Sequence, residues 1–166
     1  MKYNLTKMFE IQVDLNKKIK TTQNLTSDDT RIKSHLCILI ELMELCNETR
    51  CFNYWSKKTR GSDDAVLEEF ADVLCFLLTD IIDEPINEIE LDDSIKAEDN
   101  LKLTRRFLEL SFLYTKLNIY DYITYYEFLR KFLELGFALG YNWTQIYNSY
   151  IKKVEKNHKI QESFKK

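Results

Sequence analysis

Apolar side chains recur every three or four positions along most of this chain, which is the spacing of α-helices with one buried face. The pattern predicts helices over residues 5–20, 31–49, 63–83, 101–117, 121–140 and 142–160. Capping groups stand at three of the predicted starts: Ser62 or Asp63, Asp121, and the pair Asn142 and Gln145. We therefore predict an all-α helical bundle, formed by a single domain over residues 1–166.

The segments between the predicted helices differ in composition. Residues 21–30 are polar, whereas residues 50–62 carry Trp55, Gly61 and four basic side chains and are expected to be an ordered connection. Residues 84–100 are acidic and contain the only proline, so they are expected to be a loop or a short interrupted helix.

The composition supports the helical prediction and excludes several other classes. The 166 residues include only 3 Gly and 1 Pro, which is too little turn material for a sandwich or barrel with many tight turns. The glycines, Gly61, Gly136 and Gly140, are spaced so that neither a dinucleotide-binding glycine motif nor a P-loop is present. A hydrophobic content of 45% excludes a disordered chain.

Charge and cysteine spacing narrow the expected partners. With 24 basic and 27 acidic residues the net charge is −3, so no direct binding of nucleic acid is expected. Cys37, Cys46, Cys51 and Cys75 form no C-x-x-C pair, which argues against a zinc site and favours free thiols in a reducing cytoplasm. The apolar runs are short, so neither a signal peptide nor a membrane span is expected.

Two groups of acids stand on predicted helices that are otherwise apolar. Glu41, Glu44 and Glu48 fall within about 60° of one another on a helical projection, and apolar residues occupy most of the remaining circumference. Glu69 and Asp72 lie on a helix that is apolar on both sides. Such carboxylates are expected to face another helix across a cleft, where they repel unless cations neutralise them. Mg²⁺ is the cation that such oxygen ligands favour.

Spacing alone favours a simpler interpretation, because acids three residues apart are common in a chain with 27 of them. They would then form a solvated face or salt bridges to Arg and Lys. The apolar surroundings favour the metal site. Glu48 is expected to be either an outer acid of that site or one partner of a salt bridge at its rim.

Three segments resemble the dimeric dUTPase family, which belongs with MazG-like enzymes to the all-α nucleoside triphosphate pyrophosphatases. They are E-L-M-E-L-C-N-E at 41–48, F-N-Y-W-S-K-K at 52–58 and L-E-E-F-A-D-V-L-C-F at 67–76. The resemblance implies the bundle of that superfamily. It also implies that the E-x-x-E…E-x-x-D motif supplies the Mg²⁺ ligands, which are here Glu41, Glu44, Glu69 and Asp72.

Two further segments extend the resemblance to the ends of the chain. F-E-I-Q-V-D-L-N at 9–16 implies that Gln12, and less specifically Asn16, reads uracil. Y-I-K-K-V-E-K-N-H-K-I-Q at 150–161 is similar to a basic family segment that closes over the phosphates, which implies that Lys153 and Asn157 bind substrate. Ile160 stands where the family usually carries arginine. The resemblance is thin between 84 and 140, which marks a more variable region.

Two residues of the 50–62 connection have both a functional and a structural interpretation. Trp55 would stack on uracil or close the pocket, or else fill a gap in the core. Lys57 would meet a phosphate, or else be solvated like most basic residues in such a run.

The resemblance implies a dUTP diphosphatase that produces dUMP and pyrophosphate through attack of a metal-activated water, with dUDP as a further candidate substrate. Glu44 is the residue expected to orient or deprotonate that water. A homodimer is also implied, and the aromatic residues of 114–150 would then belong to the core or to a subunit interface. The enzyme is expected in the cytoplasm, or in the host cytoplasm if it is phage-encoded.

Two other functions remain open at this point. One is a related pyrophosphatase of another base specificity, MazG-like or dCTP-hydrolysing. The other is a helical protein-interaction or regulatory module, in which the acids form ion pairs. An active enzyme that also binds a regulatory protein combines the two classes.

Overall fold

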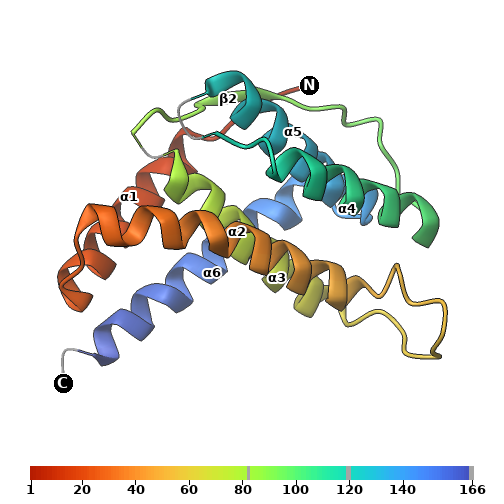
Figure 1. Cartoon of the computed structure of the whole chain (residues 1–166), viewed down its shortest axis with the longest axis horizontal. Coiled ribbons are helices and arrows are strands. Elements are labelled where there is room, and N and C mark those ends of the chain that lie inside the picture. Colours follow the sequence, from red (N-terminus) through yellow and green to blue (C-terminus); the bar gives the residue numbers. More distant parts are fainter. Residues whose placement is uncertain (82, 119–120, 165–166) are drawn as a thin grey trace.

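The computed structural model describes residues 1–81, 83–118 and 121–164. Within this part of the chain the helices are α1 (Thr6–Gln23), α2 (Ser27–Thr49), α3 (Asp63–Asp80), α4 (Asn100–Tyr114), α5 (Tyr122–Ala138) and α6 (Trp143–Ser163) (Figure 1). The prediction of an all-α helical bundle is confirmed, and each predicted helix is present with ends within about one turn of those expected.

The predicted capping groups explain where three of these helices begin. The side chain of Ser62 accepts a hydrogen bond from the backbone N–H of Ala65 at the start of α3, and Asp121 caps α5 in the same way. Asn142 and Gln145 form a complete capping box at the start of α6. These bonds satisfy backbone donors that the helix itself leaves free, so the local sequence fixes each helix start.

Two short strands occur that the hydrophobic pattern did not predict. β1 (Lys2–Asn4) pairs antiparallel with β2 (Glu88–Glu90), so that Tyr3 lies opposite Ile89. The suggestion of a short interrupted helix in 84–100 is therefore wrong, because this segment forms a strand followed by loop. Each strand has three residues, which is too short for a periodic signal.

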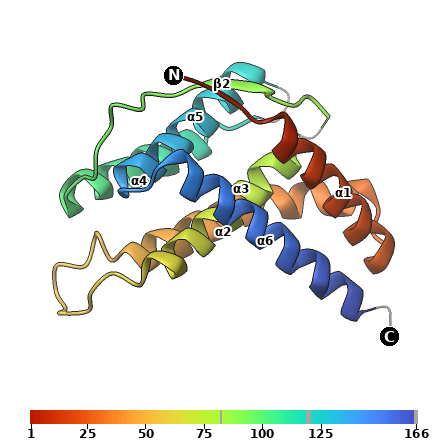
Figure 2. The ribbon, with the colours of Figure 1, turned by 180° about the vertical axis from the view of Figure 1, so that it is seen from behind.

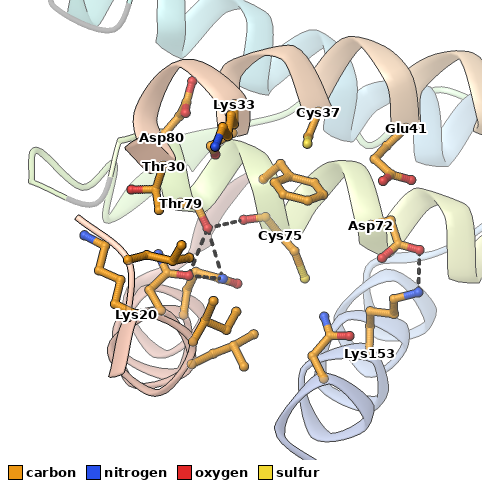
Figure 3. Close-up of a pocket in the computed structure, with 18 of the residues that line it drawn as sticks. Lys20, Thr30, Lys33, Cys37, Glu41, Asp72, Cys75, Thr79, Asp80 and Lys153 are labelled. Carbon is orange, nitrogen blue, oxygen red and sulfur yellow. Dashed lines mark hydrogen bonds and ion pairs between the residues drawn. The ribbon is translucent and has the colours of Figure 1, made fainter. Parts of the chain in front are cut away.

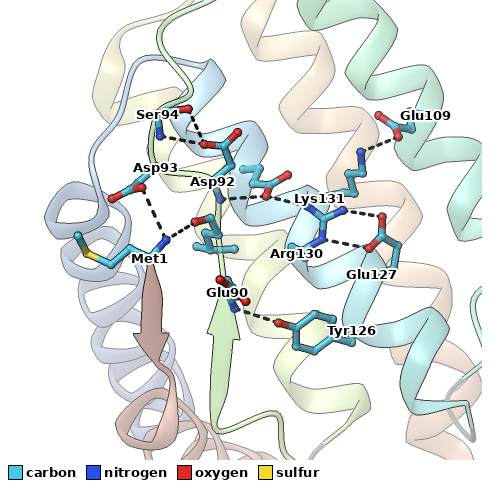
Figure 4. A network of polar contacts seen from close by, with 12 residues as sticks. Met1, Glu90, Asp92, Asp93, Ser94, Glu109, Tyr126, Glu127, Arg130 and Lys131 are labelled. Carbon is cyan, nitrogen blue, oxygen red and sulfur yellow. Dashed lines mark hydrogen bonds and ion pairs between the residues drawn. The ribbon is translucent and has the colours of Figure 1, made fainter.

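A polar network holds the β2 segment against α5 (Figure 4). Glu134 is 4% exposed and accepts hydrogen bonds from Arg130 Nη1 and from the backbone N–H of Asp92. The hydroxyl of Tyr126 accepts from the N–H of Glu90. A charge as buried as that of Glu134 is tolerated because its oxygen is paired and hydrogen-bonded.

Helix α3 lies at the centre of the fold and packs mainly against α2 and α6. The Phe70 ring stacks on that of Phe132 at 4.3 Å between centroids. A Cβ on Gly136 would overlap the side chain of Ile146, so this glycine permits the close approach of α5 and α6. The aromatic excess of 114–150 serves mainly this core, through Tyr125, Phe128, Phe132, Phe137, Tyr141 and Tyr150.

The apolar face of α2 is only partly covered. This differs from the expectation that a helix with apolar residues around most of its circumference is largely buried. Leu42 and Leu45 are fully buried, but four large apolar side chains of the same helix are exposed: Ile32, Leu36, Ile40 and Met43. The connection over residues 50–62 extends away from the helices in both views of the chain (Figures 1 and 2). None of the described helices combines the length and apolar character that a bilayer crossing needs.

Candidate active site

A cavity of about 560 Å³ lies between α1, α2, α3 and α6 (Figure 3). Carboxylates from α2 and α3 line one part of it, together with Lys153 and Asn157 of α6. Amide and hydroxyl groups from α1 and α3 line another part, and Phe76, Cys37 and Cys75 lie between the two. Carboxylates are therefore concentrated in one part of the cavity, whereas the other part combines amide and hydroxyl groups with the charged side chains of Lys20, Lys33 and Asp80.

The carboxylate part is built from Glu41 of α2 with Glu69 and Asp72 of α3, which we call the acid cluster. Each of the three offers a carboxylate oxygen, and these oxygens lie within 4.8 Å of one another. Glu69 and Asp72 share a face because they are three positions apart on one helix. Close packing of α2 against α3 brings Glu41 to them, as the helical projection suggested.

The surroundings of the acid cluster disfavour the ionised form of its carboxylates. Burial, followed by the charges of Asp72 and other neighbouring carboxylates, raises the pKa of Glu41 to about 7. Burial is also the main cause that raises the pKa values of Glu69 and Asp72. At neutral pH Glu41 is therefore only partly ionised, and a cation that binds between the carboxylates would favour their ionised forms.

Lys153 of α6 supplies the positive charge nearest the acid cluster. Its Nζ lies 2.5 Å from Asp72 Oδ2 and 3.3 Å from Glu68 Oε1, and Lys156 also contacts Glu68. This charge opposes the effect of burial on the pKa of Asp72. Asn157, one turn further along α6, also lines the cavity.

Gln12, Asn16 and Thr79 line the other part, and the buried hydroxyl of Tyr150 lies behind Gln12; we call these four side chains the amide network. Gln12 Nε2 donates to Asn16 Oδ1 at 2.9 Å and to Thr79 Oγ1 at 3.1 Å. Gln12 Oε1 accepts from the hydroxyl of Tyr150 at 3.0 Å. Gln12 is 2% exposed, so its amide is held almost entirely by protein groups.

A hydrogen-bonded pair of side chains, His35 and the buried Asp80, lies next to the amide network. His35 Nδ1 of α2 is 2.8 Å from Asp80 Oδ2 of α3, and the His35 ring stacks on Tyr114 at 5.1 Å. Asp80 lines the cavity, as does Ser34, whose buried hydroxyl has no hydrogen-bond partner among the described residues. These groups fix the spacing of α2 and α3 at this end of the cavity.

The other predicted site residues lie in different surroundings. Glu44 is exposed and stands outside the acid cluster, but its charge raises the pKa values of Glu41 and Glu69, so it lies beside them. Glu48 lies against Gly61, whose N–H donates to the Glu48 carbonyl at 3.1 Å. Trp55 is 66% exposed, and neither it nor Lys57 is among the cavity-lining residues.

Several cavity residues escaped the sequence analysis, although helical geometry could have indicated some of them. Phe76 and Thr79 follow Asp72 by four and seven positions on α3 and so share its face. Cys37 precedes Glu41 by four positions on α2 for the same reason. Tyr150 contacts Gln12 without lining the cavity, and it had no such signal, because only the crossing of α6 over α1 brings it to Gln12.

Comparison with known proteins adds an independent finding. A family model for dUTPase matches residues 4–164 of the chain. A comparison with curated proteins finds no match. The matched range includes the whole of α1, α2, α3 and α6, the helices that surround the cavity.

Proposed function

Because the chain belongs to the dUTPase family, and is thus a nucleoside triphosphate pyrophosphohydrolase, we propose that it is a Mg²⁺-dependent dUTP diphosphatase that uses the cavity as its active site. The products would be dUMP and pyrophosphate, and dUDP would be a second substrate. The observation that carries the proposal is the acid cluster, in which three carboxylates meet at the edge of a cavity large enough for a nucleotide.

The chemistry of the acid cluster fits a divalent metal, which members of this family generally use. Its donors are carboxylate oxygens, which Mg²⁺ prefers, and burial together with neighbouring carboxylates raises the pKa of Glu41 to about 7, which supports a site where a cation would be favourable. Glu41, Glu69 and Asp72 would hold the ion. When bound, it supplies counter-charge for the triphosphate and an activated water.

We assign the remaining roles from position and chemistry. Glu44 lies one turn from Glu41 and is exposed, so its carboxylate would orient the attacking water or accept its proton; it stays a candidate ligand as well. Lys153 and Asn157 would donate hydrogen bonds to phosphate oxygens, since both line the cavity near Asp72. Gln12 and Asn16 would bind the uracil base of the nucleotide.

The residues of the 50–62 connection have less structural support. Trp55 packs against Phe52 and Tyr54 rather than against the cavity, and Lys57 is exposed. Their roles in stacking on uracil and in binding phosphate stay predictions from the resemblance.

We propose that the enzyme acts as a homodimer in the cytoplasm, its own or that of a host. The exposed apolar residues of α2 support a dimer because such a row on a helix is usually covered by a partner. Sedimentation of the wild-type chain and of a Leu36→Glu variant tests this, and an unchanged mass would contradict it. A regulatory protein partner also stays a prediction.

A pyrophosphate-release assay with each deoxynucleoside triphosphate, in Mg²⁺ and in EDTA, tests the main proposal. We expect dUTP to be preferred, with products dUMP and pyrophosphate and no turnover in EDTA. Preference for dCTP would instead support the related pyrophosphatase. Absence of turnover, together with no thermal stabilisation by Mg²⁺ and a non-hydrolysable dUTP analogue, would support the interaction module.

A further inference from the structure

The turn that ends α2 brings two cysteines together. Arg50, the residue after the helix, has a φ of 55° and donates its backbone N–H to the carbonyl oxygen of Asn47 at 3.3 Å. A left-handed residue at this place reverses the chain and sets the residue that follows it against the last turn of the helix. The two residues that this turn places opposite each other are Cys46 and Cys51.

The hydroxyl of Thr49 joins the backbones of the two cysteines. Its Oγ1 donates to the carbonyl oxygen of Cys46 at 2.8 Å and accepts from the N–H of Cys51 at 3.4 Å. One hydroxyl can form both bonds, because it has one proton to donate and lone pairs with which to accept. Thr49 is 3% exposed, so water competes little for these bonds. The backbones of Cys46 and Cys51 are therefore held together without any contribution from their thiols.

The two thiols also interact with each other. A hydrogen bond from the thiol of Cys46 is the largest influence on the pKa of Cys51 and lowers it, whereas burial acts in the opposite direction. The same hydrogen bond is the main cause that raises the pKa of Cys46. The thiolate is the reactive form of cysteine, and a neighbouring thiol is the group with which it can form a disulfide. Cys51 therefore supplies the thiolate and Cys46 the second thiol.

The other two cysteines are in different surroundings. Burial raises the pKa of Cys75, which is 6% exposed. Burial, followed by the charges of Glu41 and Asp80, raises the pKa of Cys37. Within the part of the chain that the structure describes, no second thiol influences either of these pKa values. The thiolate is thus disfavoured at Cys37 and Cys75, which makes them controls for the pair at the end of α2.

We propose that Cys46 and Cys51 form a reversible disulfide when the protein meets a hydroperoxide, so that the C-terminal end of α2 is a redox-sensitive modification site. Both thiols are free in the structure, as expected under reducing conditions. A small oxidant suits the site, because Cys46 is partly exposed and Cys51 is 7% exposed. Neither cysteine lines the cavity, so the site is independent of the proposed function.

The reaction balances with a hydroperoxide as the oxidant. The Cys51 thiolate attacks one oxygen of the peroxide and its O–O bond breaks, which leaves a sulfenic acid on Cys51 and, after protonation, releases water or an alcohol. The sulfur of Cys46 then attacks the sulfur of Cys51. The S–S bond forms, and the hydroxyl group leaves with the proton of Cys46 as water. The two thiols together lose two electrons and two protons, and the peroxide takes up both.

The disulfide would fix the point where α2 passes into the 50–62 connection. This point already contacts other parts of the fold: the hydroxyl of Thr104 on α4 lies 3.1 Å from the carbonyl oxygen of Cys51, and the carbonyl oxygen of Glu48 accepts from the N–H of Gly61. Because the linked residues are only five positions apart, the bond constrains the last turn of α2 and the start of the connection, and leaves the remainder of the connection free to move.

Peptide mapping of the full-length protein tests the proposal. Trypsin cleaves after Arg50 and so places Cys46 and Cys51 in separate peptides, residues 34–50 and 51–57. After treatment with hydrogen peroxide, alkylation of the free thiols, unfolding and digestion, we expect these two peptides to be joined, with a mass two hydrogens below that of the reduced pair. Dithiothreitol should separate them. We expect the joined pair to form at least about tenfold faster than the thiol of Cys75 is lost.

Two variants identify the cysteines that form the bond, because peptide 34–50 also contains Cys37. The joined pair should persist in Cys37→Ser and disappear in Cys46→Ser. A joined pair in Cys46→Ser would overturn the proposal, as would equal rates of loss for all four thiols or oxidation of Cys51 to the sulfinic acid without a link. A monomer band on a non-reducing denaturing gel shows that the bond lies within one chain, and a dimer band would contradict this.

Hydrogen exchange of the oxidised and reduced proteins tests the effect on the fold. The amide N–H groups of residues 47–52 should exchange at least about threefold more slowly in the oxidised protein, because the bond opposes fraying of the helix end. Those of residues 57–61 should change less. Faster exchange at residues 47–52 would contradict the proposal, since it would mean that the turn must open before the two sulfurs can meet. Circular dichroism of each variant confirms that the helices are present.

Discussion

The acid cluster and the amide network are both built across neighbouring helices, yet they satisfy their polar groups in opposite ways. Three carboxylates converge in the acid cluster. Burial raises all three pKa values, and neighbouring carboxylates raise those of Glu41 and Glu69 further. In the amide network each polar atom of the buried Gln12 has a partner at 2.9–3.1 Å. The acid cluster has charges that a cation would neutralise, whereas the polar atoms of Gln12 are paired within the protein.

This difference indicates how the two regions contribute to catalysis and stability. A group of like charges costs free energy of folding and becomes favourable only when a metal and a phosphate are bound. A satisfied network of neutral groups stabilises the fold. We therefore expect substitutions in the acid cluster to affect mainly activity and metal response, and substitutions in the amide network to affect mainly stability.

Glu41→Gln should have the largest effect on activity. It removes one charge from the acid cluster with little change in shape, so the cluster binds a divalent cation more weakly. We expect kcat for dUTP to fall by roughly a thousandfold or more, as is common when a group that supports charge in the transition state is lost. Steady-state kinetics in saturating Mg²⁺ measures this.

The control for Glu41→Gln is Glu90→Gln, which removes one exposed charge on β2 from a residue that does not line the cavity. It should leave kcat within about twofold, since exposed charges contribute little. In the absence of metal, Glu41→Gln should be at least as stable as wild type at pH 8, because it relieves repulsion. Undiminished turnover in Glu41→Gln would refute the assignment of the acid cluster.

Gln12→Leu should affect stability more than any substitution in the acid cluster. Leucine removes the bonds to Asn16, Thr79 and Tyr150 and leaves at least one buried polar atom without a partner. We expect the free energy of unfolding to fall by about 1–3 kcal/mol, equally with and without Mg²⁺. Urea denaturation followed by circular dichroism measures it. A loss that Mg²⁺ reverses would show that the two regions are not independent.

The sequence predicted the fold more completely than the cavity. Helical periodicity and the caps at Ser62, Asp121 and Asn142 depend on neighbours within a few residues, so they can be recognised from the sequence alone. The pairing of Tyr3 with Ile89 is not, because it joins distant segments of three residues each. Local signals set where helices begin, whereas distant strand pairs depend on the finished packing.

Within the cavity, the acid cluster was predictable and the amide network was only partly so. Glu41, Glu69 and Asp72 are conspicuous as charges on apolar helices, and charge is costly enough to bury that its presence is informative. Thr79 and Tyr150 are neutral side chains that occur in many helices for structural reasons. Their role depends on the crossing angles of α1, α3 and α6, which the hydrophobic pattern leaves undetermined.

The metal-free protein should lose stability as the pH rises through the range in which Glu41 titrates. The pKa of Glu41 is about 7 in the fold, against 4.5 in the unfolded chain. Between these values the unfolded chain releases a proton that the folded protein retains, so the free energy of unfolding falls with rising pH and levels off above pH 7. Because Glu41 is partly exposed, we expect a change on the order of 1 kcal/mol.

Thermal denaturation in EDTA between pH 5 and 8 measures this slope. Glu41→Gln should flatten this slope. The variant therefore distinguishes the contribution of Glu41 from those of Glu69 and Asp72, whose pKa values are also raised in the fold. Added Mg²⁺ should raise stability most above pH 7, where the carboxylates are ionised. A slope of the same size in the variant would mean that another group is responsible.

The smallest effect should come from Lys156→Gln, which tests whether the special behaviour of the acid cluster reflects its burial or merely its charge. Lys156 and Glu68 form an ion pair in which the side chains are 57% and 45% exposed, whereas those of Lys153 and Asp72 are 13% and 17% exposed. Solvent screens an exposed pair, so we expect a loss of at most about 0.5 kcal/mol that disappears in about 0.5 M salt, with Mg²⁺ stabilisation unchanged. Urea denaturation at two salt concentrations measures both. A loss above about 1 kcal/mol, or a weaker response to Mg²⁺, would mean that Lys156 contributes to the charge balance of the acid cluster. That balance would then involve more of the surface than the three partly buried carboxylates and Lys153.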